Sequence, residues 1–347
     1  MSRLSVVLPA CNEEPMVEKT CRTLRELLGQ AGIRYELVLV DDGSSDGTAR
    51  VAISYAERFP GIFRLLQKEN GGHGSAINLG SREARGKYFK VIDADDWIIT
   101  ENLPAFIRYL SSCQADVVLT PFHMIDMSTG KKQFQRMYIE DYGRLYTPDE
   151  IARNWKSFDR CSTFHGITYR SAFYSEHRHE LPEKVFYEDQ EYATVPFCYA
   201  EKVAALDLPI YQYQVGNSQQ SVAAANQIRR ISHLERVIED LLEHWQANRE
   251  KPGFSNAYYQ KKLEGAILSH YVIMCILNSD KRFGRKRCAK LNRKIRDICP
   301  SVYAGVRKKY HAYLLLGLLR ITPKAYEKAI HSAPFRMLRH NHKIEKE

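Results

Sequence analysis

The sequence predicts an α/β fold in which a mostly parallel sheet is flanked by helices, followed by a helical C-terminal region. Two observations support this prediction. Over the first hundred residues, short runs of strand-forming residues alternate with runs whose apolar residues recur at helical spacing. Beyond Gln227 only the helical spacing continues. Strict alternation is typical of a parallel sheet, because successive parallel strands need a crossover that is usually a helix.

The individual elements follow from these patterns in chain order. Strands are expected at 4–8, 35–40, 62–66 and 88–92, and helices at 13–28, 46–59 and 74–85. A mixed region follows, with a helix at 103–112, strands at 117–120, 164–169 and 209–215, and a helix at 189–200. Helices are then expected at 228–248 and 258–277, and the apolar run 313–321 predicts a buried or interfacial helix. We expect two domains, residues 1–222 and 223–347.

Charge is distributed unevenly along the chain. Residues 1–227 carry 25 Lys and Arg against 30 Asp and Glu, whereas residues 228–347 carry 26 against 11. The net charge of +10 is therefore a property of the C-terminal part. Such a basic region can serve an anionic membrane surface, nucleic acid or solubility, and charge alone does not choose among them.

Cysteine usage and hydropathy indicate a cytoplasmic protein. The eight cysteines show no CxxC spacing, and the chain is too long to need disulfides for stability. The first residues, "MSRLSVVLPACNEE", do not resemble a signal peptide, because the apolar run is short and acids follow at once. The sequence also lacks an uninterrupted apolar run of about 18 residues, the length that a membrane-spanning helix requires.

Polar and glycine-rich segments follow each of the first four predicted strands. They are "PACNEE", "DDGSSDGT", "KENGGHGS" and "DADD". In open parallel sheets, ligands bind beyond the carboxyl ends of the strands, so these four segments are expected to form one site.

The acids that follow the fourth strand suggest a metal site. Asp93, Asp95 and Asp96 crowd like charges at one turn, which normally costs stability. Two carboxylates in an Asp-x-Asp turn suit a hard divalent cation, Mn²⁺ or Mg²⁺, which could also bind the oxygens of a nucleotide diphosphate. The alternative is a solvated loop whose acids cap the helix that begins near Asn102. The three companion segments favour the metal site.

Each companion segment also has a purely structural alternative. Asp42 ends the second strand, where its carboxylate could accept the N3–H of uracil or a similar base edge. The same segment could instead be a turn in which Asp46 caps the next helix. "NGGHG" could be a flexible linker or a set of backbone N–H groups facing phosphate. His73 could lie on the surface of this loop, or it could contact a ligand; the sequence leaves both alternatives open.

Four ordered motifs, "VVLPACNEE", "VLVDDGSSDGT", "KENGGHGSAINLG" and "KYFKVIDADDW", resemble the nucleotide-sugar domain of family 2 glycosyltransferases. The resemblance is close over residues 3–120 and looser to about 222. It implies the GT-A fold, a Rossmann-like sheet flanked by helices, and an inverting reaction. It further implies that Asp42 contacts the base, that Asp93 and Asp95 serve the ribose and the metal, and that Asp95 is the direct metal ligand. The expected donor-binding residues are Pro9, Cys11, Glu13, Asp42, Asn70, Asp93 and Ala94.

The resemblance also implies a catalytic base in a Glu-Asp element, here within "FYEDQE". Asp189 is the expected base, and Glu188 is expected to orient it or to bind acceptor. The alternative for Asp189 is a helix N-cap. His165 could face the acceptor, or it could be a packed or surface histidine.

Two positions depart from the family pattern. Cys11 stands where many relatives carry an aromatic residue, and Gln214 stands where an arginine is common. Without that arginine the resemblance does not assign contacts to the diphosphate from this second region, and Gln220 and Ser221 stay its candidate lid residues.

Together these features predict an inverting, metal-dependent transferase. It would move a hexose-type sugar from a nucleotide diphosphate, chiefly a UDP-sugar, to a hydroxyl of a glycan or lipid-linked glycan in cell-surface polysaccharide synthesis. One alternative is a sugar nucleotidyltransferase, which usually has a basic glycine-rich loop after its first strand. The other is a non-catalytic basic adaptor for membrane or nucleic acid, which would not need the acids retained here.

A basic stretch near the C-terminus suggests where a membrane could bind. Between residues 281 and 310, twelve Lys and Arg face a single acid, Asp297, and apolar residues punctuate them. Such a stretch can lie on anionic headgroups at the inner face of the cell membrane, or it can be a solvated helical face. Nucleic acid is the less favoured partner.

Overall fold

A computed structural model describes residues 3–26, 34–216 and 224–330. The chain divides into two compact units, Met1–Val215 and Gly216–Glu347. The expected domain boundary at residues 222 and 223 lies outside the described residues.

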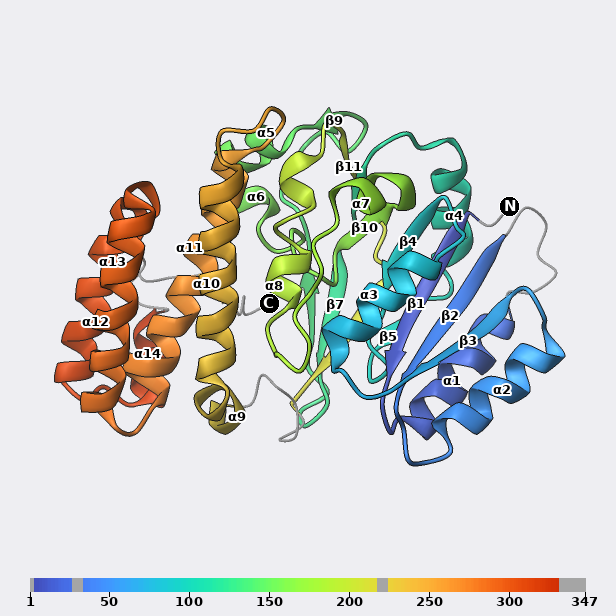
Figure 1. The fold of residues 1–347 in the computed structure, drawn as a ribbon, viewed down its shortest axis with the longest axis horizontal. Coiled ribbons are helices and arrows are strands. Elements are labelled where there is room, and N and C mark those ends of the chain that lie inside the picture. The colour runs from blue at the N-terminus through green and yellow to red at the C-terminus, as the bar shows by residue number, and fades with distance from the viewer. Residues whose placement is uncertain (1–2, 27–33, 217–223, 331–347) are drawn as a thin grey trace. The chain divides into compact units, whose positions relative to one another are not determined.

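The first unit is built on an eight-stranded sheet, which confirms the predicted α/β class (Figure 1). Its order is β3 (Phe63–Lys68), β2 (Tyr35–Asp42), β1 (Leu4–Ala10), β4 (Tyr88–Val91), β10 (Ile167–Arg170), β6 (Val117–Leu119), β11 (Val203–Ala205) and β9 (Leu145–Tyr146). The four strands from β3 to β4 are parallel, whereas β10 runs antiparallel to both β4 and β6. The four predicted N-terminal strands are all present.

Alternation along β1 and β2 places helices on both faces of this sheet. The helices are α1 (Glu14–Arg25), α2 (Thr48–Arg58), α3 (His73–Glu83) and α4 (Leu103–Ser112). Val6 and Leu8 belong to the core cluster that includes apolar residues of α1, α2 and α4. Val7 points the other way, toward α3, where a Cβ added at Gly80 would lie 2.3 Å from Val7 Cγ1. Glycine at position 80 therefore lets α3 approach the sheet closely.

A second sheet of four strands was only partly predicted. Its order is β5 (Trp97–Ile98), β12 (Tyr211–Val215), β7 (Phe122–Asp126) and β8 (Lys132–Gln135). We expected polar connections where β7, β8 and β9 lie. These strands are short, and β8 alternates between half-buried and exposed residues, so hydrophobic periodicity gives them little signal.

Short helices complete the first unit, and one differs from the prediction. They are α5 (Pro148–Arg153), α6 (Trp155–Phe158), α7 (Ser171–His177) and α8 (Asp189–Tyr192). A single helix over 189–200 was expected, but α8 ends at Tyr192 and only a 3₁₀ turn, η1 (Phe197–Tyr199), follows. Pro196 cannot donate the backbone hydrogen bond that a continuous helix requires there.

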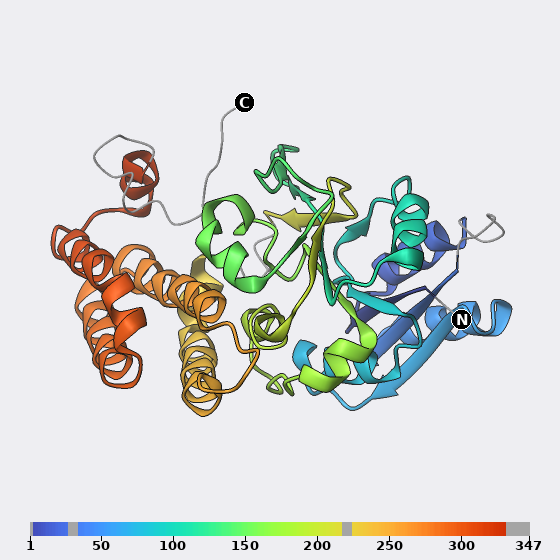
Figure 2. The ribbon, with the colours of Figure 1, turned by 90° about the horizontal axis from the view of Figure 1, so that it is seen from above.

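The second unit is helical, as predicted (Figure 2). It contains α9 (Ala224–Arg229), α10 (Ile231–Asn248), α11 (Asn256–Val272), the π-helical turn η2 (Ile273–Leu277), α12 (Lys281–Ile298), α13 (Pro300–Leu318) and α14 (Pro323–Ile330). Within the described ranges, none of the helices is both long enough and apolar enough to cross a bilayer.

Candidate functional site

The turn that follows β4 connects the two sheets of the first unit. It begins at the carboxyl end of β4 in the large sheet and leads into β5 of the small sheet. The backbone N–H of Asp96 donates to the carbonyl of Asp93 at 3.0 Å, which closes the turn. All three predicted acids therefore lie where parallel strands present a ligand site.

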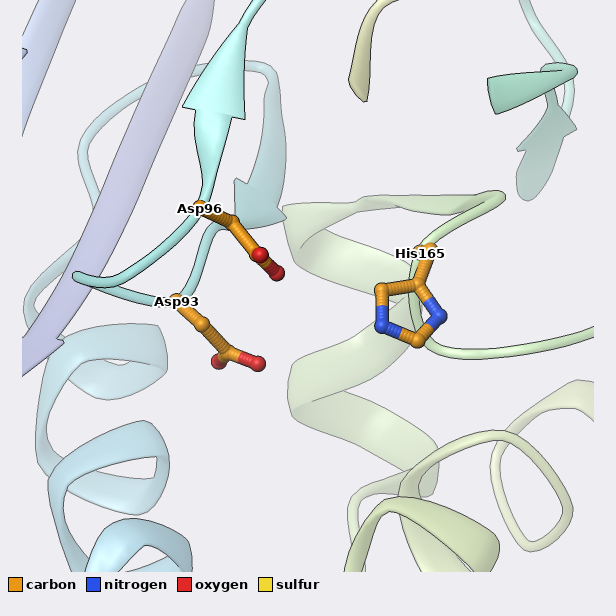
Figure 3. Close-up of side chains that lie close together, drawn as sticks. All are labelled: Asp93, Asp96 and His165. Atoms are coloured by element: carbon orange, nitrogen blue, oxygen red, sulfur yellow. The ribbon is translucent and has the colours of Figure 1, made fainter. Parts of the chain in front are cut away.

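Two of these acids meet a histidine from a distant segment. Asp93, Asp96 and His165 each offer a ligand atom, and these atoms lie within 4.8 Å of one another (Figure 3). His165 belongs to the segment that leads into β10. Two carboxylates and an imidazole form a donor set that fits a divalent cation such as Mn²⁺ or Mg²⁺.

The pKa of Asp96 shows the cost of this crowding. Asp96 is 1% exposed. Burial, and then the charges of Asp93 and Asp95, raise its pKa well above the usual range. A cation held beside these carboxylates would favour their charged forms, so the acids behave as a site suited to positive charge.

Asp96 also holds β12 in place. The Tyr211 hydroxyl donates to Oδ2 of Asp96 at 2.5 Å, and the Gln214 backbone N–H donates to Oδ1 at 2.7 Å. The side-chain amide of Gln214 also donates to the Asp95 carbonyl. Gln214, which stands where the family resemblance suggested an arginine, is thus buried and positions the acidic turn.

Asp95 lies outside the three-residue group, although its charge acts on both Asp96 and Glu13. Burial, followed by the charges of Asp95 and Asp46, raises the pKa of Glu13. Glu13, expected to bind the donor, therefore lies close enough to the acidic turn for the charge of Asp95 to affect its pKa. The role of Asp95 as the direct metal ligand stays a prediction.

His73 joins the acidic turn to the Glu-Asp element. Its Nε2 lies 2.8 Å from Asp93 Oδ1, and its Nδ1 lies 2.6 Å from Glu188 Oε1. Although burial favours the neutral ring, the carboxylates of Asp93 and Glu188 raise the pKa of His73 well above its usual value. A protonated imidazole donates from both nitrogens, which matches two carboxylate partners. Whether His73 also contacts a ligand, one of the two alternatives that the sequence left open, stays a prediction.

Asp42 is strongly engaged by the chain itself. Its Oδ1 accepts from Lys68 Nζ and the Gly71 backbone N–H, both at 2.9 Å, and its Oδ2 accepts from the Gly72 N–H at 2.8 Å. Gly72 has φ +87°, which favours glycine. Asp42 thus fixes the loop that precedes His73, and its predicted contact with a base stays a prediction.

The other predicted donor-binding residues lie at the same edge of the sheet. The Asn70 side-chain amide donates to the Asp42 carbonyl at 3.0 Å and to Cys11 Sγ at 3.5 Å. Pro9 continues β1 opposite Val40, and Ala94 is buried in the acidic turn. Gln220 and Ser221 lie outside the described residues.

Asp189 is the first residue of α8, and Glu188 occupies the N-cap position. The N-cap alternative for Asp189 was therefore wrong. Asp189 Oδ2 accepts from the Gln190 side-chain amide at 3.1 Å, and its charge acts on Tyr213 in β12. Glu188 is buried and bound to His73, which supports an orienting role.

Aromatic rings surround His165 on several sides. The rings of Phe122, Tyr211 and Tyr213 have centroids 5.1, 5.1 and 4.1 Å from its own. Burial lowers the pKa of His165 to about 4, so its imidazole is neutral and can act as a metal ligand. It is a packed histidine, as one alternative held, but it points at the acids rather than away from them (Figure 3).

Lys90 donates hydrogen bonds to the backbone of the segment that carries His165. It is 1% exposed, and its Nζ donates to the carbonyls of His165 at 2.7 Å and Ile167 at 3.2 Å. Sequence reasoning missed this lysine, which reads as part of a buried strand. The one feature of the sequence that could have pointed to its role is the presence of a cation inside an otherwise apolar strand.

Comparisons with known proteins agree with this geometry. Residues 5–174 match the model of "Glycosyl transferase family 2". The chain is 26% identical over 309 residues to a putative glycosyltransferase, EpsH, of Bacillus subtilis (strain 168), covering 85% of this chain and 83% of that protein. It is 27% identical over 290 residues to an uncharacterized glycosyltransferase, EpsJ, of the same organism, covering 80% and 78%.

Solved structures show the same fold. Staphylococcus aureus TarS 1–349 matches with a TM-score of 0.63 at 18% identity, covering 92% of this chain and 88% of that chain. The same protein in complex with UDP-GlcNAc matches with a TM-score of 0.62 at 17% identity, covering 92% and 89%. These likenesses identify the GT-A architecture predicted from the motifs.

The burial of Lys90 makes stability depend on pH. Burial lowers the pKa of Lys90 from 10.5 to about 7, so between these values the unfolded chain binds more protons than the folded one. The free energy of unfolding therefore rises with pH in this window, by at most about 1.4 kcal/mol per pH unit from this group. Urea denaturation at pH 7, 8 and 9 should show that the free energy of unfolding of the wild type, relative to that of Lys90→Met, increases with pH. Parallel pH curves would contradict the assignment.

Removing His73 should leave two carboxylates without their shared cation. We expect His73→Ala to lower the free energy of unfolding by about 2–3 kcal/mol, less than for a fully buried pair because the His73 side chain is 33% exposed. Adding Glu188→Gln should recover part of the loss, because it removes one stranded charge. His311→Ala, an exposed control on α13, should cost little. Equal losses for His73→Ala and the control at pH 7 would refute the bridging role.

Proposed function

The chain is a family 2 glycosyltransferase with a GT-A fold, and from this premise we propose that it transfers a sugar with inversion from a nucleotide diphosphate to a hydroxyl. The proposed donor is a UDP-sugar, and the proposed acceptor is a glycan or lipid-linked glycan of a cell-surface polysaccharide. A protein of the same fold, TarS, binds UDP-GlcNAc, which supports this choice of donor. The eight free cysteines support a reducing, cytoplasmic setting.

One observation carries the proposal. His73 contacts Asp93 of the acidic turn, 20 residues further along the chain, and Glu188 of the Glu-Asp element, 115 residues further along, both at hydrogen-bond distance. A transferase must place a donor beside an acceptor, so it needs donor-binding and acceptor-activating groups in one site. The contact through His73 supports such a pairing.

The proposed metal is Mn²⁺ or Mg²⁺. Asp93 and Asp95 are the proposed ligands, and the proximity of Asp93 to His165 and Asp96 supports this placement. When bound, the cation would stabilise negative charge on the departing diphosphate. The hydrogen bonds from Tyr211 and Gln214 to Asp96 would hold the turn in register for this role.

Asp189 is the proposed general base. In an inverting displacement the acceptor oxygen attacks the sugar carbon on the face opposite the diphosphate, and its proton must be removed there. Glu188 is engaged with His73, and Asp189, the next residue, is the carboxylate of this element that we assign to proton transfer. The role of Glu188 would then be to orient α8.

The family match supports glycosyl transfer over the two rival functions. A sugar nucleotidyltransferase would carry a basic glycine-rich loop after β1, where this chain has "PACNEE". A non-catalytic adaptor would not need the acids that this chain retains at Asp42, Asp93, Asp95 and Asp189.

Asp95→Ala tests the metal assignment. We expect donor turnover that depends on manganese to disappear, because the variant lacks the proposed ligand. A thermal-shift screen of UDP-, GDP- and dTDP-sugars with and without manganese identifies the donor for the wild type first. The same screen and a nucleotide-release assay are then applied to Asp95→Ala and to the surface control Asp297→Ala. Full activity in Asp95→Ala would remove Asp95 from the metal site.

Asp189→Asn tests the base. Sugar transfer should fall by roughly 10²-fold or more, the usual scale for a lost general base, while donor affinity stays near the wild-type value. Glu176→Gln, whose side chain is 75% exposed, should leave both quantities unchanged. If Asp189→Asn transfers sugar at the wild-type rate, the base lies elsewhere.

A further inference from the structure

The C-terminal end of α13, including the residue that caps it, exposes three leucines to solvent. Leu315, Leu318 and Leu319 are 56%, 61% and 63% exposed, more than any other large hydrophobic residue that the structure describes. Their spacing of three and four residues places them on neighbouring positions of one helix surface. We call these three residues the leucine patch. Exposed apolar side chains gathered in this way mark interaction surfaces.

Cations lie on the elements next to the leucine patch. Arg285 Nη1 donates to the Gly317 carbonyl at 3.2 Å, so the N-terminal turns of α12 lie beside the patch. Figures 1 and 2 both show α12 and α13 side by side. Arg282 and Lys286, one helical turn apart on α12, are exposed, and so is Arg320, which follows the patch. No carboxylate of the described residues forms an ion pair with these three cations.

The basic surface continues along both helices. Lys290 and Arg293 extend the row on α12, and Arg307 and Lys308 occupy the exposed side of α13. Lys308 lies seven residues before Leu315, two helical turns away on the same side. The opposite sides of both helices are buried, through Cys288, Leu291, Ile295, Val302, Val306 and Tyr310. The exposed side of each helix therefore carries several cations, and the exposed side of α13 is apolar at its C-terminal end.

We propose that this surface docks the chain onto an anionic phospholipid bilayer. The leucine patch enters the boundary between headgroups and acyl chains, and the flanking cations contact headgroup phosphates. The docking rests on this surface alone and not on the proposed transfer reaction. It would bring the chain to a lipid-linked acceptor.

Two other occupants fit the surface less well. A second copy of the chain, packed through the same surface, would bring its cations against Arg282, Lys286 and Arg320. Nucleic acid would match the cations but would leave three leucines in water. An anionic bilayer satisfies both the charge and the apolar patch.

The experiment compares the full chain and its variants by flotation with vesicles. The wild type should float with phosphatidylcholine vesicles that contain phosphatidylglycerol and should not float with phosphatidylcholine alone. Leu318→Glu/Leu319→Glu should lower the partition coefficient by roughly tenfold or more, because charged side chains do not enter the bilayer boundary. Ile53→Glu/Leu145→Glu makes the same charge change at residues 42% and 48% exposed, outside the patch. This control should float like the wild type.

A second variant addresses the cations and does not touch the patch. Arg282→Glu/Lys286→Glu should also lose vesicle binding, and added salt should weaken the wild type in the same direction. Both variants should keep wild-type thermal unfolding and wild-type donor turnover in solution. That pair of results would separate failure of docking from failure of the proposed function.

Three outcomes would overturn the proposal. Equal flotation of the wild type and Leu318→Glu/Leu319→Glu would remove the patch from any lipid contact. If the wild type and Leu318→Glu/Leu319→Glu both bound double-stranded DNA tightly and neither bound vesicles, the surface would be assigned to nucleic acid. A dimer of the wild type that the leucine variant abolishes in gel filtration, again without vesicle binding, would assign it to a second copy.

Discussion

The mutual repulsion of the carboxylates after β4 is the constraint on which the site depends. Asp96 is buried beside two other acids and accepts hydrogen bonds from Tyr211 and Gln214 of β12. These bonds fix the turn between the two sheets, and the raised pKa of Asp96 records the cost. A fold that keeps such a cluster spends stability on it, which is typical of a site completed by a ligand.

The sequence predicted the parallel part of the fold because its signals are local. Each of β1 to β4 is a short apolar run followed by a polar segment, and parallel pairing brings those segments to one edge. The strands β7, β8 and β9 were not predicted because they are short and half exposed, so their apolar residues show no clear periodicity. Pro196 was a visible helix breaker whose effect on the expected helix was overlooked.

Long-range contacts account for what the sequence left open at the site. His73 reaches Glu188, and Lys90 reaches the carbonyl of His165 75 residues away. No spacing rule connects such positions, since only the folded topology brings them together. The motifs predicted a group of acids after β4, whereas the basic side chains that contact these acids became visible only in the folded structure.

The bridge through His73 also has a consequence for how the two substrates would interact. One imidazole bridges the carboxylates of Asp93 and Glu188, so a ligand that displaces the Asp93 carboxylate would also change the hydrogen bonding available to Glu188. Binding on either side would then carry a coupling free energy, and linkage requires that coupling to be reciprocal.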